Sequence, residues 1–431
     1  MKYLIYDILF HLFLIITIPW YLFKMIVNGK YRHRLLERFA VYGTKEVTLA
    51  QKDKPAVWFH AVSVGETRAV MPLLKRFKEE HPETRIVFST VTRTGRELAK
   101  KEGDGLIDSI IYMPIDLGWV VTRAVNIIRP AIFIIVEKEY WPNIINRIRS
   151  SGAPVMVINA TISRKSFDRY KRLSFFFADL FKRLSLFCAK RTEDAERVIE
   201  LGMDKAKVNV TGNIKFDMEE VNAARETAGL AESLAITKDD VVIVAGSTHA
   251  GEETIIIDLF KKLTKDYPEI KLLIAPRHPN RFDEVARIIK DAGLKTKRRS
   301  LCAGGEDKDA VILLDTVGEL FMAYALASVS FVGGSLVSIG GHNLLEPAYH
   351  SSPVLYGPHI ETCADMAELL EASGGGKVVT DKDDLYNTLL ALIANEGLRL
   401  KMGKDAKTAL EANKGATEKT IRMIEELGVL K

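Results

Sequence analysis

Short apolar runs rich in Val, Ile and Phe alternate with longer stretches of helical periodicity along most of the chain. In the first half, the runs that predict strands are residues 56–59, 85–91, 110–113, 132–137, 155–159, 186–189 and 208–212. In the second half they are residues 241–247, 271–276, 311–315, 328–334, 353–357 and 377–380. Because these runs are apolar on both faces and helical stretches separate them, they indicate parallel sheets covered by helices on both sides.

This pattern predicts an α/β fold of two Rossmann-like domains that face each other across a cleft. The break falls between Gly212 and Thr237, where a strand gives way to a polar helical stretch rich in Ala and Glu. The expected segments are 1–28 for a membrane-anchor helix, 29–215 and 216–400 for the two domains, and 401–431 for helices that pack back toward the first domain. Ligands of such folds bind at the carboxyl ends of the strands.

The N-terminus departs from this pattern. Residues 8–23 (ILFHLFLIITIPWYLF) contain no Asp, Glu, Lys or Arg, but they are fewer than the roughly 20 residues that a spanning helix needs. Asp7, His11 and Pro19 also weaken a spanning helix. Lys2 precedes the run, and the basic residues that follow it are Lys24, Lys30, Arg32, Arg34 and Arg38. We expect a membrane anchor, spanning or interfacial, with the body of the protein in the cytoplasm.

Charge and cysteine content exclude several classes of protein. The net charge is only +5 over 431 residues, which does not suggest a nucleic-acid partner. The three cysteines, Cys188, Cys302 and Cys363, are widely spaced. They form neither a disulfide framework nor a zinc ribbon, and they indicate a reducing compartment.

The stretch FHAVSVGE (59–66) places one carboxylate where a strand gives way to a helix. Ser63 and Glu66 have the spacing of a capping box, in which both side chains satisfy backbone amides at a helix start. A carboxylate at the carboxyl end of a parallel strand is also well placed for chemistry. The residues alone leave both interpretations open.

Two other sites in the first half carry charge near a strand end or the domain junction. Glu137 and Glu139 follow the run 132–137 and precede Trp141-Pro142-Asn143, where they form either a salt-bridged rim or a functional pair. Lys215, in GNIKFD, lies at the domain junction and could face the cleft.

Three strand ends stand out in the second half. In AGSTHAGEE (245–253), Ser247 and Thr248 either bind a phosphate at a helix start or simply cap that helix. In APRHPNRF (275–282), the strand ends in Arg277 and His278. The stretch 331–348 contains two glycine pairs, which allow close approach of the backbone to a ligand. It also contains Asn343 and Glu346, which suit a capping box or a ribose contact.

No metal site is expected. Asp307-Lys-Asp309 and Asp381-Lys-Asp383 have the Asp-x-Asp spacing of metal-dependent sugar transferases. Both are interpreted as solvated loops that lead into strands, at the wrong end of the sheet. No His, Cys and Asp cluster has metal-ligand spacing.

Six motifs, in order along nearly the whole chain, resemble one family. They are HAVSVGE, E-x-E-x-WPN, GNIKFD, STHAGEE, RHPNRF and GGHNLLEPA. The family is the 3-deoxy-D-manno-octulosonic acid (Kdo) transferases of lipopolysaccharide biosynthesis. The resemblance implies a glycosyltransferase-B fold with a membrane anchor at the cytoplasmic side of the inner membrane. It also implies inverting, metal-independent transfer of Kdo from CMP-Kdo to the lipid A precursor (lipid IVA), without a cofactor.

The resemblance makes 29–215 the acceptor domain and 216–400 the donor domain. It implies that Glu66 is the catalytic base and that Glu137 and Lys215 stabilise the transition state. The residues implied for the CMP site are Arg277, His278, Val317, Gly318, Glu319, Asn343, Leu344, Leu345 and Glu346. A helix N-terminus favours an ionised carboxyl group, so we expect Glu66 to be a base at neutral pH. Lys138 and Tyr140 depart from the Thr and Leu that are common in the family.

Two alternative functions and two interpretations of one segment remain open from the residues. A UDP-sugar transferase or epimerase would share the second-half motifs, and a membrane-tethered nucleotide-binding protein would use the same fold without chemistry. The segment 163–184 mixes basic and aromatic residues, so it is either a contact with an anionic membrane or a surface helix whose aromatic side chains pack on the sheet.

Overall fold

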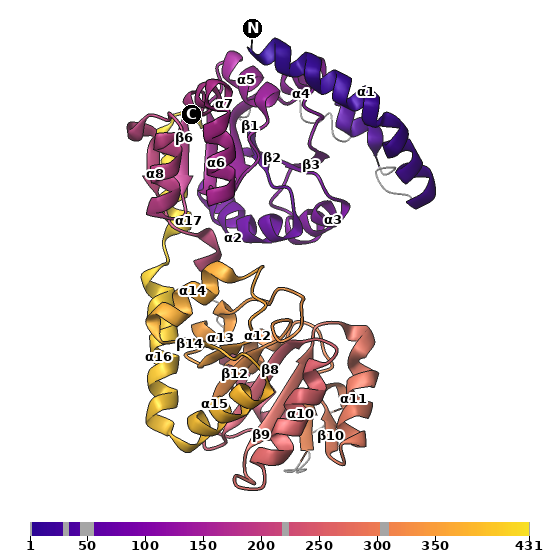
Figure 1. Ribbon diagram of the computed structural model, residues 1–431, viewed down its shortest axis with the longest axis vertical. Coiled ribbons are helices and arrows are strands. Elements are labelled where there is room, and N and C mark those ends of the chain that lie inside the picture. Colours follow the sequence, from indigo (N-terminus) through magenta and orange to yellow (C-terminus); the bar gives the residue numbers. More distant parts are fainter. Residues whose placement is uncertain (1, 29–33, 44–55, 218–223, 302–309, 431) are drawn as a thin grey trace. The chain divides into compact units, whose positions relative to one another are not determined.

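The computed structural model describes residues 2–28, 34–43, 56–217, 224–301 and 310–430, with the backbone alone at residues 18, 21–28 and 310. The chain forms two compact units (Figure 1). The first unit comprises Met1–Glu219 with Asn413–Lys431, and the second comprises Glu220–Ala412. Each unit is built on one parallel sheet, which confirms the predicted class of fold.

The sheet of the first unit has the strand order β3-β2-β1-β4-β5-β6-β7. Its strands are β1 (Ala56–His60), β2 (Arg85–Thr90), β3 (Ser109–Tyr112), β4 (Pro130–Val136), β5 (Val155–Ala160), β6 (Leu186–Ala189) and β7 (Val208–Val210). Alternate residues of a strand enter different cores, as the two-residue period requires. Trp58 packs with Phe133 on one face, whereas Phe59 packs with Phe77 on the other. The strands are therefore apolar on both faces.

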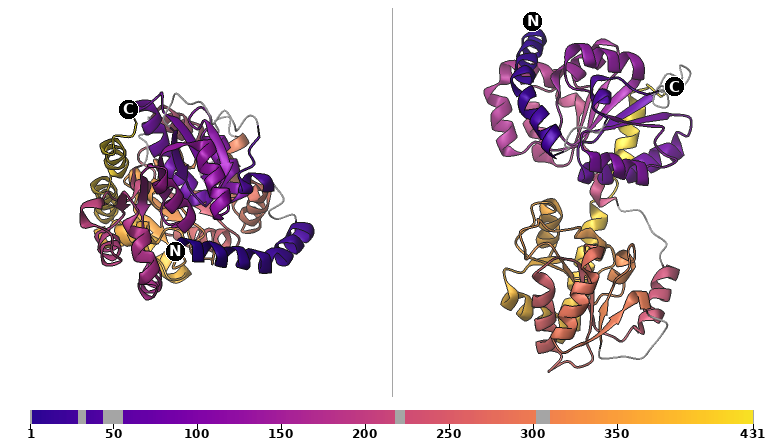
Figure 2. Two further views of the ribbon diagram at one scale, coloured as in Figure 1. Left: turned by 90° about the horizontal axis from the view of Figure 1, so that it is seen from above. Right: turned by 90° about the vertical axis from the view of Figure 1, so that its right-hand side faces the viewer.

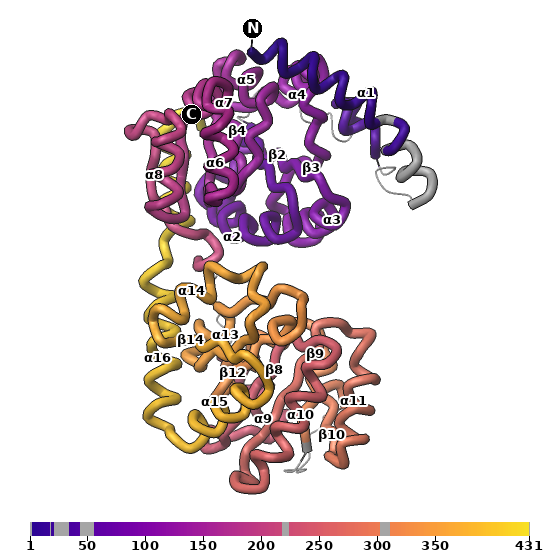
Figure 3. The backbone as a smooth tube through the Cα atoms, viewed as in Figure 1, coloured from indigo at the N-terminus to yellow at the C-terminus, as the bar shows by residue number. Residues whose placement is uncertain are grey.

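Helices cover both faces of this sheet. They are α2 (Val64–Glu80), α3 (Arg93–Glu102), α4 (Gly118–Ile128), α5 (Pro142–Ser150), α6 (Arg164–Arg172), α7 (Ser174–Lys182), α8 (Thr192–Glu200) and α17 (Ala416–Glu426), with the 3₁₀ helices η1 (Leu35–Phe39), η3 (Lys205–Lys207) and η4 (Ile214–Phe216). The C-terminal segment, yellow in Figure 3, returns to this unit. Asp217 accepts hydrogen bonds from the amides of Gly415 and Thr417, which fixes the start of α17.

The second unit has the strand order β10-β11-β9-β8-β12-β13-β14. Its strands are β8 (Val242–Thr248), β9 (Lys271–Pro276), β10 (Lys295–Arg298), β11 (Ala310–Leu313), β12 (Val329–Val332), β13 (Val354–Tyr356) and β14 (Gly376–Val378). Its helices are α9 (Ala224–Leu234), α10 (Glu252–Leu263), α11 (Phe282–Asp291), α12 (Leu320–Tyr324), α13 (Leu345–Tyr349), α14 (Ala364–Ser373), α15 (Lys382–Ala394) and α16 (Glu396–Ala412), with η5 (Pro279–Arg281) and η6 (Arg299–Leu301).

The sequence prediction for this unit missed one strand and was wrong about one loop. Strand β10 was not predicted, because its sequence KTKR is polar, as suits a strand at the edge of a sheet. Asp381 does not lie in a loop that leads into a strand. It follows β14 and caps α15, accepting hydrogen bonds from the amides of Asp383 and Asp384 at 2.9 Å. Asp307, Asp309 and Cys302 lie outside the described residues, and the described Cys188 and Cys363 are buried.

The N-terminal helix α1 (Lys2–Asn28) docks against the first unit (Figure 2). Asp7 Oδ1 accepts a hydrogen bond from the Gly118 amide at 2.8 Å and another from Asn143 Nδ2 at 2.7 Å. These two contacts tie α1 to the starts of α4 and α5. The apolar side chains of α1 that pack against the core are Tyr3, Phe10 and Leu14.

The expected anchor region thus forms a helix. In the part of the chain that the structure describes, however, no helix is both long enough and apolar enough to cross a bilayer. Of the basic residues after the apolar run, Lys30, Arg32 and the Lys24 side chain lie outside the described residues. Arg34 pairs with Glu37, and Arg38 donates to the Val91 carbonyl at 2.8 Å.

The segment 163–184 forms α6 and α7, and most of its aromatic side chains pack inward. Phe167 and Phe181 are buried, and Tyr170 and Phe177 are partly buried against the same core. Phe175 is the exception, because 68% of its surface is exposed. Most of these aromatic residues therefore pack against the core of the first unit, as expected for a surface helix.

Candidate active site

Glu66 lies in the first turn of α2, directly after the end of β1. Ser63 Oγ accepts a hydrogen bond from the Glu66 amide at 3.3 Å, and Glu66 Oε2 accepts one from the Val62 amide at 2.6 Å. The predicted capping box is confirmed with one difference, since Glu66 reaches the amide of Val62 and not that of Ser63. Among the described residues, Glu66 Oε1 has no hydrogen-bond partner. One oxygen therefore caps the helix while the other remains able to accept a proton.

The pKa of Glu66 is raised above its ordinary value. Burial is the main cause, and the nearby carboxylates of Glu137 and Glu139 add to it, whereas the Val62 amide opposes it. Burial thus outweighs the expected effect of the helix N-terminus on this pKa, because only 8% of Glu66 is exposed and desolvation disfavours the charged form. That Glu66 is a base at neutral pH stays a prediction. A carboxylate with a raised pKa is a stronger base once ionised.

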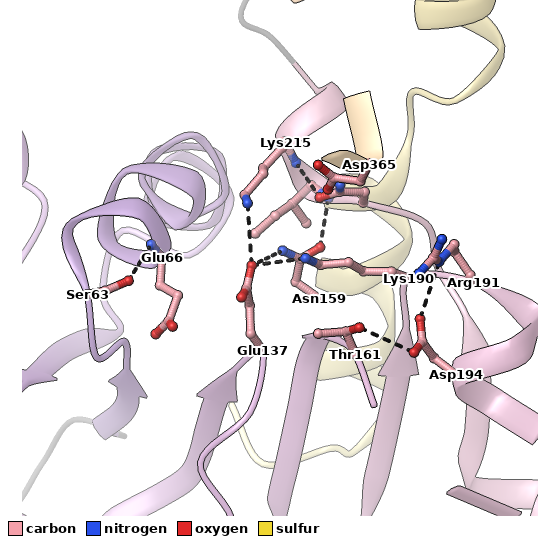
Figure 4. Close-up of polar contacts among 12 residues, drawn as sticks. Ser63, Glu66, Glu137, Asn159, Thr161, Lys190, Arg191, Asp194, Lys215 and Asp365 are labelled. Atoms are coloured by element: carbon pink, nitrogen blue, oxygen red, sulfur yellow. Dashed lines mark hydrogen bonds and ion pairs between the residues drawn. The ribbon is translucent and has the colours of Figure 1, made fainter. Parts of the chain in front are cut away.

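Glu137 follows β4 and is held by three donors. Its Oε1 lies 3.0 Å from Lys190 Nζ, 3.6 Å from Lys215 Nζ and 3.4 Å from Asn159 Nδ2. Figure 4 shows this cluster on one side of Glu137 and Glu66 on the other. Burial raises the pKa of Glu137, but the two lysines more than offset this effect and lower the pKa overall. The two carboxyl groups therefore differ. Glu66 is the more easily protonated of the pair, and Glu137 is the more easily ionised.

Backbone strain marks the ends of β4 and β5. Glu137 has φ 67° and Asn159 has φ 52°, a left-handed conformation that costs a residue other than glycine roughly 1–3 kcal/mol. Asn159 Oδ1 also accepts a hydrogen bond from the Ile214 amide at 3.2 Å, which holds η4 and with it Lys215. Strain of this kind in neighbouring buried residues is typical of functional sites.

Sequence reasoning missed Asn159 and Lys190. Both had a usable signal, because Asn159 ends the apolar run 155–159 and Lys190 directly follows the run 186–189. The carboxyl ends of parallel strands meet at one edge of the sheet, so these polar residues belong beside Glu137.

In the second unit, a buried carboxylate joins two loops at the strand ends. Glu252 accepts hydrogen bonds from the amides of His249, Gly334, Ser335 and Leu336 at 2.9, 2.8, 3.1 and 3.0 Å. Glu252 was not among the predicted site residues. It links the loop after β8 to the glycine-rich loop after β12.

The glycine-rich loop presses directly on the end of β8. A Cβ atom at Gly333 would lie 2.5 Å from the Ser247 carbonyl oxygen and 2.6 Å from Thr248 Cα. Helix α10 is capped at Gly251, so the interpretation of Ser247 or Thr248 as its N-cap was wrong. Thr248 Oγ1 is buried, and no hydrogen-bond partner lies near it in the described residues.

Three imidazole rings gather at the same edge of the second sheet. His249 Nε2 and His342 Nε2 are 2.8 Å apart, and the ring of His278 lies 5.3 Å from that of His249. The pKa of His342 is lowered to about 4, mainly by burial and in addition by the neighbouring His249 and Arg277. The His249–His342 pair lies beside the exposed Arg277.

The remaining predicted residues lie at the carboxyl ends of β11 and β12. Val317 is 81% exposed, Gly318 has φ 98°, and Glu319 accepts a hydrogen bond from Arg299 at 2.9 Å. Asn343 Nδ2 donates to Glu346 Oε1 at 3.0 Å. Leu344 and Leu345 are fully buried, so neither of them is open to a ligand in this structure.

Comparisons with known proteins agree on one family. The family described as 3-Deoxy-D-manno-octulosonic-acid transferase (kdotransferase) matches residues 33–218. The 3-deoxy-D-manno-octulosonic acid transferase of Haemophilus influenzae is 34% identical over 403 residues, 93% of this chain and 92% of that protein. The enzyme of the same name from Chlamydophila psittaci is 31% identical over 417 residues, 96% and 94% of the two chains.

A solved structure shows the fold alone. UDP-GlcNAc 2-epimerase from Neisseria meningitidis, bound to UDP-GlcNAc, has a TM-score of 0.58 at 14% identity and covers 86% of this chain and 100% of its own. This likeness confirms the two parallel-sheet domains of the glycosyltransferase-B type and does not favour epimerase activity. On the sequence relationships above, the chain belongs to the family of 3-deoxy-D-manno-octulosonic acid (Kdo) transferases, as its motifs predicted.

Proposed function

We propose that the protein transfers Kdo from CMP-Kdo to a lipid A precursor (lipid IVA), with inversion and without a metal. The observation that carries this proposal is the pair of unlike carboxyl groups in the first unit. Glu66 has a raised pKa and one unengaged oxygen, whereas Glu137 is held ionised by two lysines. Acid groups with pKa values pushed in opposite directions suit distinct roles in one reaction.

Glu66 is the proposed general base. The acceptor hydroxyl loses its proton to Glu66 Oε1 as its oxygen attacks the anomeric carbon of Kdo. That carbon gains oxocarbenium-like positive charge as its bond to the CMP phosphate breaks. Glu137 places negative charge close to this site, while Lys215 and Lys190 keep that carboxylate ionised and oriented.

The second unit is proposed to hold the donor. Arg277, His278 and the amides around the glycine-rich loop are suited to the phosphate, since cations and oriented N–H groups stabilise the charge of a departing phosphate. Ser247, Thr248 and the turn from Val317 to Glu319 belong to the same strand-end edge. Glu346 is suited to accept hydrogen bonds from the ribose hydroxyls.

A transfer assay tests the function. The full-length protein is incubated with CMP-Kdo and detergent-dispersed lipid IVA, and we expect released CMP together with an acceptor whose mass has grown by Kdo. Turnover of UDP-sugars in place of CMP-Kdo would support the alternative transferase or epimerase. Donor binding without turnover would support a binding protein.

The exposed face of α1 is proposed to lie in the interface of the inner membrane, on its cytoplasmic side. The docked helix leaves a row of apolar side chains uncovered, and Ile16 is 77% exposed. The exposed apolar side chains of α1 and the neighbouring α7 include Leu4, Ile8, Leu12, Ile16 and Phe175. A helix that is fixed to a soluble body by one face and apolar on the other suits an interfacial position.

Replacing Leu12 and Ile16 with Glu is expected to abolish vesicle binding. Each buried aliphatic side chain contributes about 1.5–3 kcal/mol, so partitioning into vesicles should fall at least ~100-fold. Flotation with vesicles that contain anionic phospholipid measures this. Leu400→Glu, an exposed leucine of the second unit, is the matched control and should bind normally. Equal flotation of both variants would contradict the interfacial position of α1.

A further inference from the structure

A cavity of about 340 Å³ opens on the first unit, beside the segment that follows Glu137. Lys138, Glu139, Tyr140 and Trp141 form one wall, and Arg169 and Tyr170 of α6 form another. The proposed mechanism uses none of these side chains. A concave pocket with aromatic walls and a few convergent polar groups is the usual form of a ligand site.

The charges of this cavity favour an anion. Lys138 and Arg169 have no carboxylate within ion-pair distance among the described residues. Neighbouring cations do have such partners, since Arg164 pairs with Asp168 and Lys171 pairs with Glu200.

One acid, Glu139, belongs to the lining, and burial raises its pKa, which favours its neutral form. With Lys138 and Arg169 against this one acid, the lining is net cationic. The phenol oxygen of Tyr140 is buried, and the described residues offer it no hydrogen-bond partner.

The position of the cavity links it both to the proposed base and to the N-terminal helix. Glu139 raises the pKa of Glu66, so the lining is within electrostatic reach of that carboxyl group. On another side, the ring of Phe10 in α1 lies 6.4 Å from that of Trp141. A ligand in the cavity would thus have Glu66 near one part and the docked side of α1 near another.

We propose that this cavity binds the phosphorylated sugar headgroup of the acceptor glycolipid, with Arg169 and Lys138 on a phosphate and the aromatic side chains against the sugar. This inference rests on the proposed function. An anionic headgroup of an ordinary phospholipid, or free phosphate, offers similar charge but no sugar ring. The glycolipid is favoured because the cavity lies close to Glu66, where the acceptor hydroxyl must be deprotonated.

Steady-state kinetics with Arg169→Gln test the pocket. A lost charge-assisted hydrogen bond is expected to raise the KM for lipid IVA roughly ten- to hundredfold. The kcat and the KM for CMP-Kdo should stay unchanged, because the variant keeps Glu66 and the second unit. Arg172→Gln is the matched control, since Arg172 is exposed on the same helix but does not line the cavity.

Acceptor chemistry supplies the second measurement. Removal of the acceptor phosphates should raise the KM of the wild type as much as Arg169→Gln does, and should add nothing further in the variant. Millimolar inorganic phosphate and vesicles of anionic phospholipid should compete weakly.

An equal rise in the KM for lipid IVA in Arg169→Gln and Arg172→Gln would overturn the proposed pocket, because it would indicate an effect of general surface charge. Full retention of the preference for the phosphorylated acceptor by Arg169→Gln would also overturn it. If the wild type transfers no Kdo to lipid IVA, the proposed function itself fails. If the wild type is active and the variant has an unchanged KM, the pocket alone fails.

Discussion

Glu66→Gln is expected to lower Kdo transfer by roughly 10²–10⁴-fold while leaving the affinity for CMP-Kdo unchanged. The amide can still accept the hydrogen bond from the Val62 amide, so the start of α2 keeps its cap. It cannot take a proton from the acceptor hydroxyl. Initial rates at saturating acceptor, together with calorimetric titration of CMP, measure the two quantities.

The pH profile gives an independent check of Glu66. A general base must be ionised, so activity falls as pH decreases through its pKa. Because the pKa of Glu66 is raised, this loss should begin at a higher pH than for an exposed carboxyl group. The residual activity of Glu66→Gln should not show this loss at low pH.

Ser63→Ala separates capping from catalysis. It removes the other half of the cap at a cost of about 0.5–2 kcal/mol but retains the carboxylate. It should therefore transfer Kdo at nearly the normal rate. A folded Glu66→Gln protein with almost full activity, or an equal loss in Ser63→Ala, would show that Glu66 is structural.

Glu252→Gln is expected to cause the largest loss of stability in the second unit. The carboxylate accepts four backbone N–H groups, whereas the amide would turn its own donors toward some of them. Each buried amide left without an acceptor costs about 1–3 kcal/mol, so two would cost about 2–6 kcal/mol. At about 2–4 °C per kcal/mol, the melting temperature should fall clearly.

Glu252→Gln should also lower the affinity for the donor. The loops that Glu252 joins carry His249 and the glycine-rich stretch proposed for the phosphate. Thermal unfolding and CMP titration measure both effects. Glu284→Gln is the control, because it removes an exposed acid that pairs with Arg281 at 2.9 Å. A Glu252→Gln protein that melts and binds CMP like the wild type would contradict the linking role.

The strands were predictable because buried strands consist mostly of apolar residues, which the sequence shows directly. Central strands such as β4 are apolar at nearly every position, and this local pattern can be recognised without knowledge of the tertiary contacts. Strand β10 pairs with β11 alone and is partly exposed, so polar residues are tolerated there. The docking of α1 was also unpredictable, because Asp7 looked like an interruption of an apolar run and is in fact its attachment point.

The candidate site was predictable where a charge interrupts an apolar pattern. Glu66 and Glu137 stand out for this reason. Glu252 does not, because an acid in the first turn of a helix is ordinary and its partner Gly334 lies 82 residues later. The raised pKa of Glu66 depends on burial and on neighbouring carboxylates, which only the folded chain brings together.

The return of the chain to the first unit has a consequence for the order of synthesis. Ala416, Ile421 and Ile424 of α17 are buried in the same core as Phe59 of β1. These residues leave the ribosome after the whole of the second unit. Domains usually fold in order as they are made. Here the first domain to emerge is the last to be completed, and until then it exposes an apolar surface that a molecular chaperone would recognise.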